Sequence, residues 1–206
     1  MNKDYPIPLR MAHLPKDKRG FPIPVSILLD NEGTPHFTIT DTHKATSCAI
    51  ADTCHLCGKS LTRAKWLIGG PRCAFHTNGA YLDGPMHLEC AQYALNVCPY
   101  IALKSYTKEI GDKKLDYSKV DEGFYTHETA TVHDDKPNLF VLVGTTKLDW
   151  GMMDVRPMFV PTRPFFGVHF WKDGKQLNNA EQVKELLTSD DLFSEFTELQ
   201  YPDYLE

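Results

Sequence analysis

The residues best suited to chemistry in this chain are two short pairs of metal-ligating side chains. Cys54 and Cys57 are separated by two residues and followed at once by Gly58, and thirty positions later His87 and Cys90 have the same spacing. Two thiolates so spaced can hold one ion from a tight turn, in which glycine supplies a positive φ. Residues three apart lie on one face of a helix and can reach the same ion. We therefore predict a Zn²⁺ site with three cysteine ligands and one histidine.

The ligand types also predict what the ion does. A catalytic zinc ion keeps an open position for water, whereas three thiolates and one imidazole close the tetrahedron. We therefore expect one structural Zn²⁺, whose binding energy is folding energy. Among the six cysteines, Cys73 or Cys98 could replace a named ligand or be a small buried residue near the site. Cys48 and His55 are weaker candidates, and we expect His55 to face solvent.

Basic residues follow the first cysteine pair. Residues 54–75 contain no acid and four basic residues, Lys59, Arg63, Lys65 and Arg72. These could contact the phosphates of a nucleic acid or a protein partner, with Trp66 stacking on a base. The alternatives are an ordinary solvated surface and a core position for Trp66. Residues 1–114 carry a net charge of +4 and residues 115–206 a net charge of −9, so the acidic half could instead imitate a polyanion.

An enzymatic alternative depends on His76. Nucleases of the His-metal type combine a treble-clef fold with a separate histidine that acts as general base beside a divalent ion. His76 could have this role in a metal-dependent hydrolase or nuclease, with Asn78 or Asp83 as its partner. The GxGxxG, P-loop and GxSxG motifs are absent. We therefore favour a non-enzymatic binding protein, in which His76 is a surface histidine.

Two further groups of residues have weaker patterns. His127 and His133 flank acidic residues, but their spacing of six fits no common metal motif, so we interpret this stretch as a polar loop. Aromatic and arginine residues near prolines in the second half could line a pocket for an anionic ligand or pack in the core; they are Trp150, Arg156, Arg163, Phe165, Phe166 and Trp171.

The predicted ligands require a turn, a hairpin and a helix to position them. Pro85 precedes His87, and an apolar run follows Cys90, which predicts a helix that begins near this pair. We expect a hairpin around residues 65–68 between the two ligand pairs. A turn, a hairpin and a helix in this order are the layout of a treble-clef-like zinc module, at about residues 48–101.

The other elements follow from apolar alternation, turns and caps. We predict strands at 25–29 and 37–40 that form a hairpin around a turn at 30–33. We also predict strands at 138–145 and 165–171, with a turn at 172–175. We predict a helix at about 180–187, capped by Asn178 or Asn179, and a second short helix from Ser189. Residues 104–122 should form a surface insertion and residues 152–162 a proline-containing loop.

These elements indicate an α+β fold, in which antiparallel hairpins and a small sheet with peripheral helices surround the zinc module. Residues 1–20 should be an extended arm, and residues 21–206 a single domain with an acidic helical region at about 178–206. The chain is 42% hydrophobic and 24% charged, so it can bury a core. It contains no apolar run of membrane-spanning length and no secretory signal, so we expect a cytoplasmic location.

The combined motifs resemble a family of uncharacterised proteins of bacteria and their phages. The shared pattern comprises Gly20–Pro24, Gly33-x-Pro35-x-Phe37, Cys54-x2-Cys57-Gly58, Gly70-Pro71-x-Cys73, Pro85-x-His87-x2-Cys90-Ala91 and Cys98-Pro99. A looser likeness covers Lys136–Asn138 and the surroundings of Trp171 and Gly174. The resemblance implies a single fold with the zinc site, in a bacterial host. The chain departs from the family at Phe75–Thr77, where the family has a polar Asn-Arg pair.

Overall fold

The computed structural model describes residues 4–102, 119, 137–189 and 204. These residues form an α+β fold of antiparallel sheets and peripheral helices, which confirms the predicted fold class. Three predictions lie outside the described residues: nearly all of the 104–122 insertion, the stretch with His127 and His133, and the helix after Ser189.

The elements follow one another along the chain as a short 3-10 helix, eight strands and five α-helices in the described residues. In order they are η1 (Leu9–Met11), β1 (Ile27–Leu29), β2 (Pro35–Thr40), α1 (Thr42–Ala51), β3 (Lys65–Gly69), α2 (Pro71–Phe75), α3 (Leu88–Val97), α4 (Pro99–Ala102), β4 (Phe140–Thr145), β5 (Leu148–Met153), β6 (Arg156–Pro161), β7 (Gly167–Lys172), β8 (Lys175–Leu177) and α5 (Ala180–Thr188).

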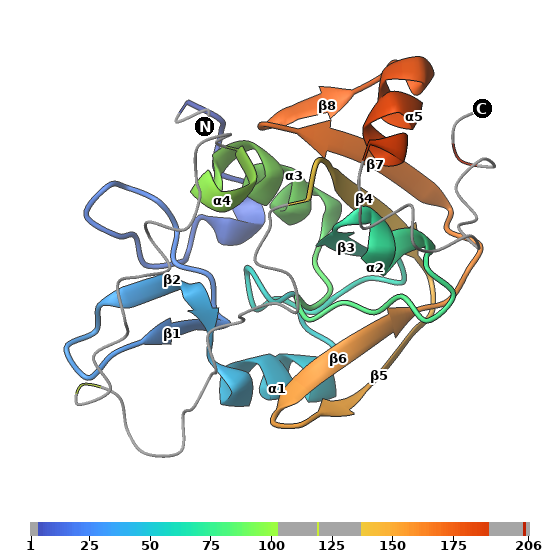
Figure 1. Ribbon diagram of the computed structural model, residues 1–206. Helices are drawn as coiled ribbons and strands as arrows, with labels where there is room; N and C mark the ends of the chain where they lie inside the picture. Colours follow the sequence, from blue (N-terminus) through green and yellow to red (C-terminus); the bar gives the residue numbers. More distant parts are fainter. Residues whose placement is uncertain (1–3, 103–118, 120–136, 190–203, 205–206) are drawn as a thin grey trace.

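A four-stranded antiparallel sheet in the order β3–β4–β7–β8 forms the centre of the molecule (Figure 1). β4 is buried along its whole length, as its uninterrupted apolar run predicts. β4 and β7 correspond to the strands predicted at 138–145 and 165–171, and they pair from Phe140 opposite Trp171 to Gly144 opposite Gly167. β3 pairs with the other edge of β4. The sheet thus joins the cysteine-rich segment to the second half of the chain.

The two faces of this sheet bury two separate cores, because side chains alternate along each strand. One core faces α3 and contains three cysteines together with other apolar residues; its members include Cys54, Cys57, Cys90, Trp66, Ile68, Phe140, Leu142 and Trp171. The other core faces α2 and α5 and contains Leu67, Val141, Val143, Phe159 and Phe170. The metal-ligand motifs therefore belong to one layer of the fold.

The predicted loop at 152–162 is wrong, because these residues belong to the hairpin of β5 and β6. Asp154, at a φ of 55°, takes the left-handed conformation that a two-residue hairpin turn requires. The prolines are compatible with β6 because Pro157, Phe159 and Pro161 are every second residue of the strand, so their backbone nitrogens point to the same side. The Phe159 N–H points away from β5 and donates to the carbonyl oxygen of Tyr81 over 2.8 Å. Proline at these positions removes no bond to β5.

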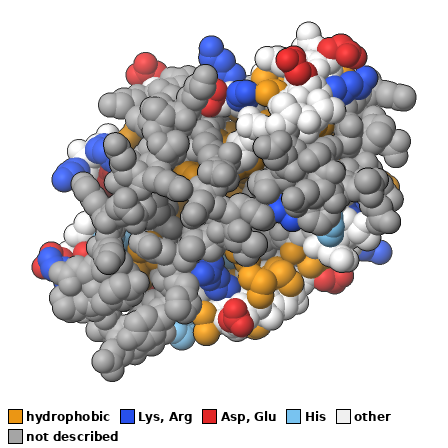
Figure 2. Space-filling view, viewed as in Figure 1, with side chains coloured by type: hydrophobic (Ala, Val, Ile, Leu, Met, Phe, Trp, Pro, Cys, Tyr) orange, Lys and Arg blue, Asp and Glu red, His pale blue; other side chains and the backbone are white. Residues whose placement is uncertain are grey.

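Hydrophobic side chains gather over the part of the surface where β5 and β6 lie (Figure 2). Trp150, Met152, Met153, Val155 and Val160 are each between 40% and 52% exposed. This hairpin lies outside the central sheet, and β6 is the strand whose side chains enter the core. The face of β5 remains apolar and solvent-exposed.

Among the remaining elements, some were predicted from local sequence signals and others were not. The predicted hairpin of β1 and β2 is confirmed, and so is α5, where the Asn179 side chain accepts from the Gln182 N–H over 3.1 Å. Helix α1 was not expected, although Asp41 caps it by accepting from the Lys44 N–H over 3.0 Å. The expected extended arm instead contains η1, and Met11 is buried in the core that also contains Cys54, Cys57 and Cys90.

Candidate metal centre

A tight turn positions the first cysteine pair. The Cys54 N–H donates to the Lys59 carbonyl over 2.9 Å, and the Gly58 N–H donates to the Cys54 carbonyl over 2.7 Å. Gly58 has a φ of 72°, which is the positive value that the sequence predicts for this position. The Cys57 N–H points at the Cys54 Sγ, 3.5 Å away. The turn therefore directs backbone donors toward sulfur, as a buried thiolate requires.

Helix α3 positions the second pair. His87 is the residue immediately before the helix, and Cys90 lies in its first turn. The segment before the helix is held against the cysteine turn, because the His55 N–H donates to the Pro85 carbonyl over 3.1 Å. The prediction that this pair lies at a helix N-terminus is therefore confirmed.

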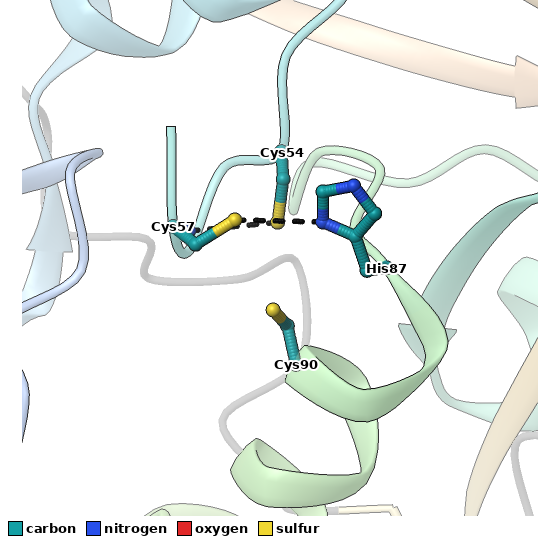
Figure 3. A group of neighbouring side chains, drawn as sticks. All are labelled: Cys54, Cys57, His87 and Cys90. Atoms are coloured by element: carbon teal, nitrogen blue, oxygen red, sulfur yellow. Dashed lines mark hydrogen bonds between the residues drawn. The ribbon is translucent and has the colours of Figure 1, made fainter. Parts of the chain in front are cut away.

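The two pairs converge on one point, where their side chains face one another (Figure 3). The ligand atoms of Cys54, Cys57, His87 and Cys90 all lie within 4.8 Å of one another. The three cysteines are fully buried, and His87 is 3% exposed. Four such atoms at this separation could hold one metal ion. The described residues bring together the four ligands that the sequence predicts.

A second contact orients the ring of His87. Its Nδ1 lies 3.4 Å from the Cys57 Sγ, inside the cluster. Its Nε2 lies 3.0 Å from the Ser60 carbonyl oxygen, which can only accept, so Nε2 carries the proton. Nδ1 is then the unprotonated nitrogen that a metal requires. Ligand histidines typically have a second partner of this kind, which sets the tautomer.

The three thiols share their protons unequally. Hydrogen bonds from Cys54 and Cys90 favour the Cys57 thiolate and lower the pKa of Cys57. The hydrogen bond with Cys57 raises the pKa of Cys54. Hydrogen bonds with Cys54 and then Cys57 raise the pKa of Cys90. A divalent cation would replace the retained protons, so metal binding at this cluster would release protons.

The remaining cysteines lie outside the cluster. Cys73 is half-buried in α2 and packs against the core on the opposite face of the sheet, and Cys98 ends α3. Glu89, next to the ligands in sequence, pairs with Arg10. Among the described residues, the group that could hold a metal ion is therefore Cys54, Cys57, His87 and Cys90, and neither Cys73 nor Cys98 belongs to it.

The expectation that His55 faces solvent is wrong. His55 is 4% exposed, and its ring contacts Phe159 edge-on with the centroids 5.2 Å apart. Burial lowers the pKa of His55 to about 4, so the imidazole is neutral at pH 7. The turn displays its two cysteines on one side and inserts His55 into the protein on the other. The spacing of residues in the sequence does not show that the His55 side chain lies on the side of the turn opposite to the two cysteines.

The predicted contact residues have different environments. Lys59 and Arg63 are exposed in the segment after Cys57, whereas Arg72 is half-buried in α2. Lys65 binds both carboxylate oxygens of Asp52, at 2.8 and 2.7 Å, and its side chain is 13% exposed. Trp66 is 7% exposed, which corrects the base-stacking interpretation in favour of its core alternative. It packs against Gly144 and Gly167 of the central sheet.

His76, the candidate general base, follows the end of α2. Its Nδ1 accepts a hydrogen bond from the Asn78 backbone N–H over 3.1 Å, and its carbonyl oxygen accepts from Arg163 over 2.7 Å. Arg163 also donates to the Ala74 carbonyl, so it satisfies the end of the helix. Asp83 is exposed. These contacts fix the turn that follows α2.

Two predicted groupings differ from the structure. Trp171 and Phe165 lie in the cores on opposite faces of the sheet, so the aromatic and arginine residues do not line one pocket. The hairpin expected around residues 65–68 is not formed. Residues 65–69 are instead the strand β3, which pairs with β4 from the second half of the chain. Its link to the segment before α3 is a bridge of two hydrogen bonds between Trp66 and Met86.

Comparison with known protein families, with curated proteins and with solved structures finds no match to this chain. The resemblance to a family of bacterial and phage proteins, and the treble-clef assignment, remain predictions from the sequence. Among the residues that the structure describes, none of the helices has the length and apolar character needed to cross a membrane.

Proposed function

We propose that Cys54, Cys57, His87 and Cys90 bind one Zn²⁺ and that this ion is structural. The observation that carries the proposal is the convergence of four buried ligand atoms within 4.8 Å. Three thiolates and one imidazole are typical ligands of a closed tetrahedral zinc site, whereas Mg²⁺ and Ca²⁺ prefer oxygen ligands. No ligand position remains for the water that catalysis needs.

The energy of such a site supports a structural role. Structural Zn²⁺ binds zinc-finger peptides with about 10–16 kcal/mol of apparent free energy. The net stability of a whole domain is about 5–15 kcal/mol. The cluster connects the cysteine turn to the start of α3 inside one of the two cores. Loss of the ion would therefore remove an amount of free energy comparable to the stability of the fold, and would leave three thiols buried together.

Substitution of one ligand tests this proposal. Cys57→Ser should lose zinc and unfold at least residues 48–98, which thermal denaturation and metal analysis of the purified protein can detect. The matched control is Cys73→Ser, a half-buried cysteine outside the cluster, which should keep one zinc ion per chain. A Cys57→Ser protein with unchanged metal content and unchanged melting temperature would refute the structural zinc site.

We further infer that the zinc-stabilised fold is a binding protein, whose contact surface for a nucleic acid or a protein partner is the loop after Cys57. The support is the exposure of Lys59 and Arg63 beside a turn that is anchored by the cluster. Lys65 is already neutralised by Asp52, so we assign it a smaller share of any phosphate contact. The remaining charges would act mainly by counterion release, which makes binding dependent on salt.

Nucleic-acid binding measured at several salt concentrations tests whether this surface, and not another part of the molecule, makes the contact. The zinc-loaded protein is titrated with single-stranded and duplex DNA and RNA, and Lys59→Ala/Arg63→Ala is compared with Lys147→Ala/Lys184→Ala, which removes two exposed lysines elsewhere. We expect the first variant alone to reduce the slope of log K against log salt on duplex DNA, by about 1.8. Equal slopes, or no binding at low salt, would contradict the nucleic-acid surface. Cleavage with Mg²⁺ that His76→Ala abolishes would support the hydrolase alternative instead.

A further inference from the structure

The β5–β6 hairpin has one covered edge and one open edge. The two strands form a sheet of their own, so each has a second edge that their pairing does not use. On the outer edge of β6, Phe159 exchanges hydrogen bonds of 2.8 and 2.9 Å with Tyr81, and the two prolines have no N–H to offer a further strand. In Figure 1 β5 lies at the periphery, beyond β6. No described residue forms a strand pair with the outer edge of β5.

The free backbone groups of this edge belong to alternate residues. Trp150 lies opposite Phe159, whose N–H and carbonyl point away from β5. Two residues opposed in this way in an antiparallel pair both point away from each other, so the N–H and carbonyl of Trp150 point outward. The same alternation assigns outward groups to Leu148 and Met152, because the register runs through β5 without a bulge. The edge therefore presents a row of donors and acceptors to a further strand.

Apolar side chains accompany these backbone groups. Trp150 and Met152 lie on the face of the hairpin that carries the buried Phe159, yet they are 40% and 52% exposed, so they extend past the edge of the core. Edge strands of natural proteins are usually protected by proline, lysine or a bulge, and β5 has none of these within its six residues. An open edge with exposed tryptophan and methionine is typical of an interaction surface.

The charges at the two ends of β5 are complementary to those of a second copy of the same strand. Lys147 precedes the strand and Asp154 follows it. Both are exposed, and neither side chain forms an ion pair with another residue of the described chain. In an antiparallel pair of two β5 strands, the start of one strand lies beside the end of the other. Each Lys147 would then lie near Asp154 of the other copy, which gives an opposite-charge contact at both ends of the pair.

Backbone pairing and side chains together restrict the register of such a pair. The two-fold axis requires residues with outward backbone groups to lie opposite each other. The register with Trp150 opposite Trp150 pairs Leu148 with Met152 in both directions, so apolar side chains meet apolar side chains. A shift of one copy by two residues would place Asp149 opposite Asp149 in one direction, or Leu148 opposite Asp154 in the other. Both shifts are less favourable, because they pair like charges or place a charge against an apolar side chain.

We propose that β5 is a dimerisation edge, at which two copies of this chain form an antiparallel β5–β5 pair centred on Trp150. The pair would satisfy the outward backbone groups and cover exposed apolar side chains of both copies. One strand of six residues per copy is smaller than a standard interface of about 20–30 residues a side. We therefore expect a weak dimer with a Kd of about 100 μM. The hairpin contains none of the four metal ligands and none of the basic residues proposed to contact nucleic acid.

Sedimentation equilibrium of the full, metal-loaded chain at about 5–500 μM tests the proposal. We expect the average mass to rise with concentration from 23.4 kDa toward twice that value. Trp150→Lys places two lysines opposite each other at the two-fold axis and should weaken the dimer about tenfold. The matched control is Leu9→Lys, which adds the same charge at an exposed apolar residue outside the hairpin and should dimerise as the wild type does. Both positions are exposed, so zinc content and melting temperature should stay unchanged.

An exchange of charges tests whether the partner is a second copy in antiparallel register. Lys147→Glu and Asp154→Lys should each weaken the dimer about fivefold, because each variant alone brings like charges together at both ends of the pair. An equimolar mixture of the two variants should regain the wild-type affinity, because the charges at positions 147 and 154 are again opposite in the mixed dimer. Equal weakening by Leu9→Lys, or a mixture that associates no better than the single variants, would overturn the proposal. A chain that stays monomeric at every concentration would also overturn it and would favour a strand of another protein as the occupant of this edge.

Discussion

Gly84 is a position where one added methyl group should disturb the surroundings of the metal cluster. A Cβ at Gly84 would lie 2.2 Å from the Cε1 and Nε2 atoms of His55 and 2.3 Å from its Nδ1. The ring cannot move aside easily, because it is 4% exposed and contacts Phe159. The His55 backbone is also fixed, since its carbonyl accepts from the Ser26 hydroxyl over 2.9 Å.

The size of the effect follows from this geometry. Overpacking of a close-packed core usually costs about 1–3 kcal/mol. We expect Gly84→Ala near the upper end, about 3 kcal/mol, because three ring atoms lie far inside van der Waals contact and the ring has no alternative space. Relief of the clash would displace the cysteine turn or the residues before His87, so the affinity for metal should fall as well.

The assay is urea unfolding of the metal-loaded protein, together with competition against a chromophoric chelator. In a double-mutant cycle, His55→Ala should cancel most of the cost of Gly84→Ala, with a coupling energy of about 2 kcal/mol. The control is Gly151→Ala, where an added Cβ meets nothing within 4 Å, and it should change stability by less than about 0.5 kcal/mol. Wild-type stability of Gly84→Ala, or no rescue by His55→Ala, would refute this reasoning.

Two further substitutions test other parts of the fold. The hydroxyl of Tyr81 is buried without a partner, and burial raises its pKa well above the usual value of 10.0. Tyr81→Phe should therefore stabilise the protein by about 1 kcal/mol at pH 7. Above pH 10 the unfolded chain releases a proton that the folded protein keeps, so wild-type stability should fall with rising pH more steeply than that of Tyr81→Phe; equal slopes in urea unfolding would contradict this. Asp41→Ala removes the cap of α1 and should cost about 1 kcal/mol, whereas Asp41→Ser should keep most of the stability; equal losses in both would argue against capping.

Features set by neighbouring residues could be predicted from the sequence. The cysteine turn needs Gly58 at a positive φ, and the His87 pair needs a helix start, and both signals are local. The buried run of β4 and the Asn179 cap of α5 are local in the same sense. The α+β class and the four-ligand cluster therefore followed from spacing, caps and apolar runs.

Features set by distant contacts could not be predicted in this way. The partner of β3 is β4, so the hairpin expected within the cysteine-rich segment was replaced by a long-range pairing. The direction of His55 depends on Phe159, more than a hundred residues away in the chain. In β6 the prolines suggested a loop, but their nitrogens fall on the edge away from β5, which depends on strand register. Each of these three errors concerns a residue whose position is decided by tertiary contacts, whereas α1 was missed although its Asp41 cap is a local signal.

X-ray absorption at the zinc edge of the purified protein, combined with elemental analysis, tests the central claim most directly. The arrangement of Cys54, Cys57, His87 and Cys90 predicts one zinc ion per chain. It also predicts three sulfur ligands at about 2.3 Å and one nitrogen ligand at about 2.0–2.1 Å. A protein that folds without metal, that holds another metal in this cluster, or that shows oxygen ligands at the ion would contradict the structural zinc site.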